Sequence, residues 1–294
     1  MKQLVILSGK GGTGKTTVAS AFIRLANAKA YADCDVDAPN LHLVMKHPDA
    51  PERTAYDGLS KAVIDSASCT LCGLCAQHCR FGAILQEVGY RVDASACEGC
   101  GVCEAVCPAG AVSMQPSVAG ELALYKSGDA IFSTARQKTG AGTSGKLVSE
   151  VKNRMNAAAR NVDLAVIDGS PGIGCPVIAS MSGADMVLVV TEPSISGISD
   201  MARILRTAGI FRTKAAVCVN KADASPAITD QIEALCREQA IPFVGRIPFD
   251  PDAVKATNAG QSIVDRDCAS GRAVRGVFGA TMELLFPEGN GCGR

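Results

Sequence analysis

Short runs of mainly apolar residues recur along the chain, and segments with a helical pattern separate these runs. The clearest runs lie at residues 4–7, 164–168, 186–191, 214–220 and 241–247. Runs of this length, apolar at successive positions, are typical of strands that are buried on both faces of a parallel sheet. Their alternation with helical segments predicts an α/β fold with a doubly wound, mostly parallel sheet.

A long stretch in the first half of the chain breaks this alternation. Residues 44–66 are polar and mixed, which predicts a connection into an inserted unit. Residues 121–125 and 130–134 alternate about a Gly-Asp turn, which predicts a β-hairpin that returns to the main sheet. We therefore expect a discontinuous main domain and an inserted domain, at residues 1–58 with 118–294 and at residues 59–117.

The Gly-rich segment at residues 9–17, GKGGTGKTT, follows the first apolar run and precedes a helical segment at residues 18–29. Strand, loop and helix in this order form the context of a phosphate-binding P-loop. Glycines let backbone N–H groups face an anion, and the helix N-terminus adds partial positive charge. Lys15 would reach the terminal phosphates, and the Thr16 hydroxyl would bind Mg²⁺. We expect ATP to be bound by Gly11, Gly12, Thr13, Gly14, Lys15, Thr16 and Thr17.

Carboxylates follow two of the predicted strands. A short strand near residues 30–32 leads into Asp33, Asp35 and Asp37, where a loop that binds Mg²⁺ and orients the attacking water is expected. The sequence does not separate Asp35 from Asp37. Asp33 could have a structural role alone, and turn formation is an alternative role for the whole segment. Asp168 ends one of the buried strands, where a carboxylate helps to hold Mg²⁺, so it joins Asp35 or Asp37 as a catalytic candidate.

Two further strand ends are candidates for the base of the nucleotide. Asn220 follows a strand at the carboxyl edge of the predicted sheet, where ligands bind in such folds. A turn-forming role is the alternative for this residue. Pro248 and Phe249 follow the next strand, and we expect them to wall the adenine pocket.

Fourteen cysteines are present, and eight of them form two runs of the same spacing, C-x₂-C-x₂-C-x₃-C. This spacing is typical of bacterial two-cluster ferredoxins, in which three neighbouring cysteines bind one cluster and the fourth reaches the other. The inserted domain is therefore expected to be a ferredoxin-like α+β module with two 4Fe–4S clusters. We assign the first cluster to Cys69, Cys72, Cys75 and Cys107, and the second to Cys97, Cys100, Cys103 and Cys79.

Zinc and disulfides are the competing roles for these cysteines. Zinc sites rarely use three closely spaced cysteines with a fourth after three more residues. Disulfides are not expected in a cytoplasmic protein, and the chain shows neither a signal peptide nor a long apolar run that would place it elsewhere. Pro108 follows the second cysteine run, whereas Arg80 follows the first. The two runs therefore differ in the loop that lies near the second cluster.

Charge and composition exclude other classes of function. The chain has 29 basic and 29 acidic residues, so attraction to nucleic acid or to a membrane surface is not expected. Aromatic residues are scarce and tryptophan is absent, which disfavours a surface for stacking single-stranded bases. Because no flavin, haem or organic-substrate motif is visible, we expect a redox or metal-cluster partner protein.

The P-loop with its extra lysine, Lys10, resembles the deviant Walker A motif of the MinD/ParA/Mrp family, which includes the nitrogenase iron protein. The segment DCDVDAPN is similar to switch I of that family, and DGSPGIG to its switch II, written there as D-x-P-P-G-x-G. The resemblance implies a homodimer that forms on ATP binding, in which Lys10 acts in catalysis by reaching the phosphates bound by the partner subunit. It also implies that Asn220 contacts the base.

Two cysteines mark departures from this family. Cys175 follows the switch II segment, where the nitrogenase iron protein has a cluster ligand, but residues 137–146 contain no second cysteine. We therefore expect Cys175 to be a small buried residue. A lone Cys292 stands where related cluster carriers have a C-x₂-C pair.

The loop at residues 138–146 precedes a predicted helix at about residues 147–159. It could present a helix N-terminus to the nucleotide or a partner through Ser144, Gly145 and Lys146. A flexible linker is the alternative.

The chain as a whole resembles ferredoxin-containing ATPases of the MinD superfamily. Our main hypothesis is that ATP hydrolysis and dimer closure gate electron transfer between the two clusters and a protein partner. One alternative is a carrier or scaffold that supplies iron–sulfur or other metal clusters for the maturation of another protein. Another is a ParA/MinD-type positioning switch in which the ferredoxin module senses redox state.

Overall fold

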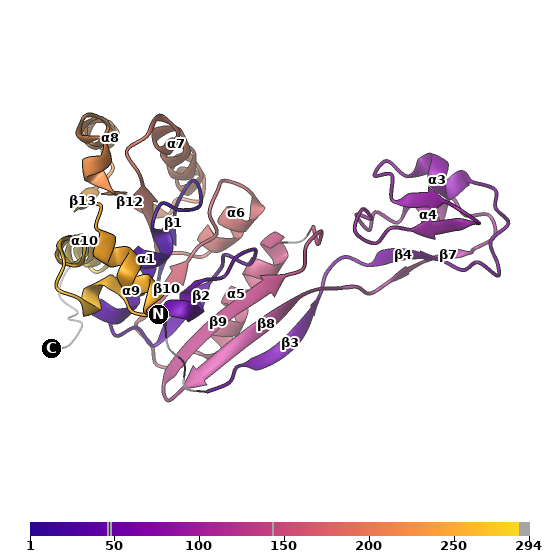
Figure 1. Ribbon diagram of the computed structural model, residues 1–294, viewed down its shortest axis with the longest axis horizontal. Helices are drawn as coiled ribbons and strands as arrows, with labels where there is room; N and C mark the ends of the chain where they lie inside the picture. The colour runs from indigo at the N-terminus through magenta and orange to yellow at the C-terminus, as the bar shows by residue number, and fades with distance from the viewer. Residues whose placement is uncertain (46, 48, 143, 288–294) are drawn as a thin grey trace.

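The computed structural model describes residues 1–45, 47, 49–142 and 144–287, and Figure 1 shows their arrangement. A nine-stranded sheet forms the centre of the larger domain. The strands from β13 to β9 are mutually parallel, β8 pairs antiparallel with β9, and β3 pairs antiparallel with β8 at the edge. The predicted mostly parallel sheet is therefore confirmed. In spatial order the strands are β13 (Phe243–Ile247), β12 (Lys214–Asn220), β11 (Met186–Thr191), β1 (Lys2–Leu7), β10 (Leu164–Asp168), β2 (Ala30–Asp33), β9 (Ala130–Gln137), β8 (Val118–Ser127) and β3 (Glu52–Asp57).

Helices cover both faces of this sheet, as a doubly wound fold requires. Along β1, Leu4 and Ile6 pack into the core on one face, while Val5 and Leu7 pack into the core on the other. The first face is covered by α1 (Lys15–Leu25), α9 (Pro251–Asn258) and α10 (Ala269–Leu285), and the second by α5 (Ser144–Ala158), α6 (Cys175–Met181), α7 (Ile195–Ile210) and α8 (Pro226–Glu238). The short helices α2 (Leu41–Val44), η1 (Ala222–Ala224) and η2 (Ile263–Asp265) lie in connections.

Helices α1 and α5 begin at Lys15 and Ser144, each three residues before the predicted start. The polar first turn of each helix shows no apolar periodicity, which explains the difference. Within the part of the chain that the structure describes, we find no helix that is both long and apolar enough to cross a membrane.

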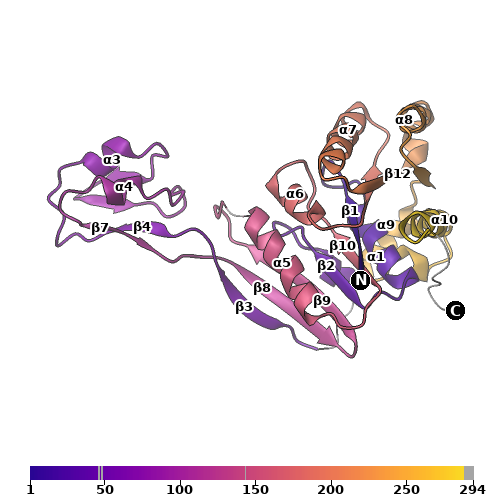
Figure 2. The same cartoon turned by 180° about the vertical axis from the view of Figure 1, so that it is seen from behind.

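The segment at residues 44–66 is more than the polar connection that its composition predicts. Strand β3 pairs with β8, and β4 (Lys61–Ile64) pairs with β7 (Val112–Gln115), both antiparallel. The two pairs form a ribbon that leads away from the main sheet, as Figures 1 and 2 show. Strand β3 is polar because it is an edge strand whose residues are almost all exposed, so its sequence carries no apolar signal.

A small module stands at the far end of this ribbon (Figure 1). It contains α3 (Leu74–His78), β5 (Ile84–Gln86), β6 (Tyr90–Val92) and α4 (Val102–Ala105), with β5 and β6 paired antiparallel. Its own core includes Cys75 and Cys97 among small apolar residues. Gly73 and Gly101 occupy the same place in the two cysteine runs, and their φ angles are 77° and 75°. Both runs thus turn into a short helix through the same left-handed residue, which glycine adopts without strain.

Candidate functional site

The Gly-rich loop between β1 and α1 borders an open cavity at the carboxyl edge of the sheet. Gly12 and Gly14 have φ angles of 80° and 88°, a conformation that side chains with a Cβ disfavour. Helix α1 begins directly after the loop, so its N-terminus faces the same space. The residues that line the cavity are Ser8, Lys10, Gly11, Gly12, Thr13, Gly14, Lys15, Thr16, Thr17, Asp35, Ala38, Asn40, Leu43, Val44, Pro171, Thr257, Asn258 and Gly260.

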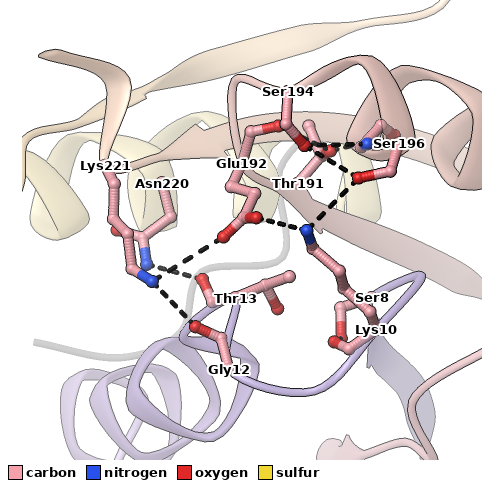
Figure 3. A network of polar contacts seen from close by, with 11 residues as sticks. Ser8, Lys10, Gly12, Thr13, Thr191, Glu192, Ser194, Ser196, Asn220 and Lys221 are labelled. Atoms are coloured by element: carbon pink, nitrogen blue, oxygen red, sulfur yellow. Dashed lines mark hydrogen bonds and ion pairs between the residues drawn. The ribbon is translucent and has the colours of Figure 1, made fainter. Parts of the chain in front are cut away.

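Two side chains hold the Gly-rich loop from its outer side, as Figure 3 shows. The Asn220 amide donates to the Thr13 carbonyl over 2.7 Å, and the Lys221 ammonium donates to the Gly12 carbonyl over 2.9 Å. The C=O and N–H of one trans peptide point in opposite directions. Carbonyls held outward therefore leave the following amides free to face an anion. Asn220 thus supports the loop, and Lys221 is a supporting residue that the sequence did not indicate.

Lys15 forms a buried ion pair at the centre of the site. Its Nζ lies 2.5 Å from Oδ1 of Asp168, and both side chains are almost inaccessible to solvent. Burial lowers the pKa of Lys15, but the carboxylates of Asp168 and Asp33 outweigh it, so the pKa is raised overall. The second oxygen of Asp168, Oδ2, is buried without a hydrogen-bond partner. An unpartnered carboxylate oxygen beside the buried Lys15 fits the donor set that Mg²⁺ prefers.

The three aspartates after β2 have different environments. Asp33 is fully buried, and its carboxylate accepts hydrogen bonds from the backbone N–H groups of Asp35, Asn40 and Leu41 over 2.9–3.0 Å. Burial and the charge of Asp168 raise the pKa of Asp33 to about 7. Asp33 therefore anchors the fold of this segment.

Of the remaining two aspartates, the structure brings only one to the cavity. Asp35 is half-buried and lines the cavity, and burial raises its pKa. Asp37 is exposed and is not among the lining residues. The geometry therefore distinguishes two candidates that the sequence could not separate.

Lys10 is held by residues of its own chain. Its Nζ lies 2.5 Å from Oε1 of Glu192 and donates to Oγ of Ser196 over 3.3 Å. The other oxygen of Glu192 lies 3.7 Å from Nζ of Lys221, so one carboxylate joins two lysines that border the Gly-rich loop (Figure 3). Glu192 follows β11, and the sequence did not single it out.

The structure does not bring Pro248 and Phe249 to the cavity. Phe249 is 53% exposed, and its backbone N–H donates to Asp223 over 2.6 Å. Thr257, Asn258 and Gly260, at and just after the end of α9, line the cavity instead. These residues lie after a helix and not after a strand, so a search of strand ends misses them.

In the inserted module, four cysteines line one shared cavity. They are Cys79, Cys97, Cys100 and Cys103, the set assigned from the spacing to the second cluster. In the other set, burial is the main cause that raises the pKa of Cys75, and the charges of Cys69 and Cys107 raise it further.

The thiols are not gathered around a single point. Among the described residues, no three Cys, His, Asp or Glu side chains are placed to hold one metal ion. One backbone contact to a thiol is nevertheless formed, since the N–H of Ala111 donates to Sγ of Cys107 over 3.3 Å.

Cys175 is exposed, which corrects the expectation that it is buried. It begins α6 at the carboxyl edge of the sheet, and an ideal Cβ on Gly145 would lie 3.2 Å from its Cβ. Ser144, Gly145 and Lys146 form the start of α5 and do not line the cavity. Cys292 and Thr143 lie outside the described residues.

Comparisons with known proteins agree with this architecture. Residues 4–263 match the model of the CobQ/CobB/MinD/ParA nucleotide-binding domain. The chain is 31% identical to the uncharacterized protein MJ0578 of Methanocaldococcus jannaschii over 234 residues, which cover 74% of this chain and 78% of that protein. It is 22% identical to the septum site-determining protein MinD of Neisseria meningitidis over 98% of this chain and 94% of that one.

Solved structures show the same fold. The cell division ATPase MinD of Pyrococcus furiosus superposes with a TM-score of 0.58 and 19% identity, covering 96% of this chain and 99% of that one. The septum site-determining protein MinD of Pyrococcus horikoshii, solved in complex with Mg-ADP, superposes with a TM-score of 0.55 and 19% identity, covering 96% of each chain.

Proposed function

The chain belongs to the CobQ/CobB/MinD/ParA nucleotide-binding family, and we propose that it uses ATP to gate electron transfer through two 4Fe–4S clusters. It is a P-loop ATPase of the MinD/ParA type, with ATP and Mg²⁺ as its nucleotide and ion. In our proposal, the ATPase domain comprises residues 1–58 and 118–294, and the ferredoxin-like module residues 59–117. The observation that carries the proposal is the cavity lined by Cys79 together with the three cysteines of the second run.

In the ATPase domain, the backbone amides of the Gly-rich loop bind the phosphates. Lys15 then exchanges its contact with Asp168 for the phosphates, and the freed Asp168 joins Thr16 in holding Mg²⁺. Asp35 orients the attacking water from the side of the cavity. Each of these roles uses a side chain that already lines the cavity or contacts one that does.

Asp35 and Asp37 provide a matched pair for testing the catalytic assignment. Asp35→Asn is expected to lower kcat for ATP hydrolysis by about 10²–10³-fold, because the carboxylate that orients water is lost. Asp37→Asn is expected to leave kcat within about twofold, since surface substitutions away from a site have small effects. Steady-state phosphate release measures both values. Equal losses in the two variants would contradict the assignment of Asp35.

In the module, the spacing of the eight cysteines and the cavity that four of them line support two clusters over separate ions. Thiolates around one zinc ion each lie about 2.3 Å from the metal and must therefore converge closely. A four-iron cube binds one thiolate at each iron, so its ligands lie farther apart around a cavity. When bound, such clusters supply one-electron transfer. The hydrogen bond from the N–H of Ala111 to Sγ of Cys107 is the type of contact that tunes the reduction potential of a cluster.

Dimerisation would connect the two halves of the mechanism. In our proposal ATP closes a homodimer, and Lys10 leaves Glu192 to contact the phosphates of the partner subunit. Glu192 would retain Lys221 as a cationic neighbour after this exchange, since the two are 3.7 Å apart. Hydrolysis then reopens the dimer and resets the contact with the redox partner.

A positioning switch is the second candidate function. The names of several relatives favour it, because they are septum site-determining proteins or ParA-family ATPases. In this version the same ATP cycle controls location, and the module reports redox state. A carrier that supplies clusters for the maturation of another protein is the third candidate function.

Anaerobic purification followed by metal analysis and redox titration tests the main proposal. We expect about eight irons per chain and reduction potentials that shift when ATP is added. About one zinc per chain in place of iron would contradict it. Transfer of iron to an apoprotein acceptor would favour the carrier. Unchanged potentials together with ATP-dependent binding to vesicles or DNA would favour the positioning switch.

A further inference from the structure

The module and the ATPase domain face each other across a cleft beside the ribbon. From the module, the cleft is lined by residues next to the second cysteine run, including Ser95 and Glu98. From the ATPase domain it is lined by the loop at residues 138–142, which follows β9. Figures 1 and 2 show this end of the β9 hairpin directed toward the module.

Two glycines of this loop allow a close approach to the module. An ideal Cβ on Gly140 would lie 3.4 Å from the carbonyl oxygen of Ser95, and one on Gly142 would lie 2.9 Å from Oε2 of Glu98. Gly140 also has a φ angle of 77°. The loop therefore contacts the module through backbone, and a side chain at Gly142 would displace the carboxylate of Glu98.

The other end of the loop is bonded directly to the segment after β2. The backbone N–H of Gln137 donates to the carbonyl of Val36 over 2.9 Å, and Val36 lies between Asp35 and Asp37. The side-chain amide of Gln137 donates to the carbonyl of Ala141, within the loop. Gln137 thus connects Val36, the neighbour of the cavity residue Asp35, to the loop that approaches Glu98.

Glu98 in turn lies between Cys97 and Cys100. The carbonyl of Cys97 accepts a hydrogen bond from Lys61, which also lines the cleft. No residue of the first cysteine run is among those that line the cleft. The two runs therefore have different neighbours: the second borders the cleft toward the ATPase domain, and the first does not.

We infer that Gln137 and the loop at residues 138–142 transmit the nucleotide state to the second cysteine run. The inference rests on the proposed function. It adds that the second cluster is the one that responds to the nucleotide. A change around Asp35 on ATP binding moves Val36, then Gln137, and alters the contact of the loop with Ser95 and Glu98. The second cluster is the one whose surroundings change with the nucleotide state.

Amide hydrogen exchange in the iron-loaded protein tests this path without relying on activity. A non-hydrolysable ATP analogue is expected to change exchange at residues 94–101 by at least about threefold and to leave residues 66–73 unchanged. Gln137→Ala keeps the backbone bond to Val36 and removes the side-chain bond to Ala141, so the response at residues 94–101 is expected to disappear. Gln231→Ala, which changes an exposed glutamine on α8, is the matched control and should retain it.

Gly142→Ala provides a second variant in the same experiment. Its new Cβ should displace Glu98 and change exchange at residues 94–101 without nucleotide. An equal response at residues 66–73, or a full response in Gln137→Ala, would overturn the inference. If ATP shifts the redox potentials while exchange at residues 94–101 stays constant, the inference fails and the proposed function stands. If iron is absent, the proposed function itself fails.

Discussion

Lys15→Ala is expected to lower kcat for ATP hydrolysis by at least about 10²–10³-fold and to leave the iron content unchanged. Lys15 is the buried cation of the nucleotide site, and it is paired with Asp168. Its removal takes away the charge that stabilises the transferring phosphoryl group. The cysteine runs lie at the far end of the ribbon, so their metal content should be insensitive to this change (Figure 1).

The same substitution should also affect stability. Removing one partner of a buried ion pair costs about 3–5 kcal/mol, because the other charge is left uncompensated. Asp168 and the neighbouring Asp33 are both fully buried. Denaturant unfolding of the variant, with and without ATP, separates this loss from the loss of chemistry. Lys10→Ala is the control for stability alone, because its partly exposed ion pair with Glu192 should contribute much less than the buried pair. Hydrolysis by Lys15→Ala at more than about a tenth of the normal rate would place the active site elsewhere.

The central sheet and the Gly-rich loop were predictable because their signals are local. Apolar runs such as β10 are buried on both faces and read as continuous hydrophobic sequence. The Gly-rich loop needs left-handed residues at Gly12 and Gly14, which restricts the sequence directly. Strand β3 was not predictable, because an exposed edge strand has no apolar pattern to detect.

What the sequence did not predict depends on how segments meet in space. Asp35 and Asp37 follow the same strand, and only the path of the chain decides which one reaches the cavity. Lys221 reaches the Gly-rich loop from a strand more than two hundred residues away, so no local pattern could indicate it. Cys175 was expected to be buried because no second cysteine is available to share a cluster with it, but it begins a helix at the open edge of the sheet.

In the proposed assignment, the fourth cysteine of each run binds the cluster of the other run. This assignment predicts how much iron remains after particular pairs of cysteines are replaced. If Cys79 belongs with the second run, the double variant Cys79→Ser/Cys97→Ser removes two ligands from one cluster and should retain about four irons. The double variant Cys69→Ser/Cys79→Ser removes one ligand from each cluster and should lose iron from both. If each run instead binds its own cluster, the two results exchange places.

The cavity shared by Cys79, Cys97, Cys100 and Cys103 favours the first outcome. Iron analysis and electron paramagnetic resonance of the reduced proteins measure how much of each cluster remains. Cys175→Ser changes an exposed cysteine of the ATPase domain and should keep about eight irons, which controls for general effects of the substitution. Unchanged ATP hydrolysis in both double variants would show that the ATPase domain is folded. Because the ribbon joins the module to one edge of the sheet, away from the central strand β1 that precedes the Gly-rich loop, loss of a cluster should leave the ATPase domain folded. Retention of about eight irons in both double variants would contradict the assignment of these cysteines as cluster ligands.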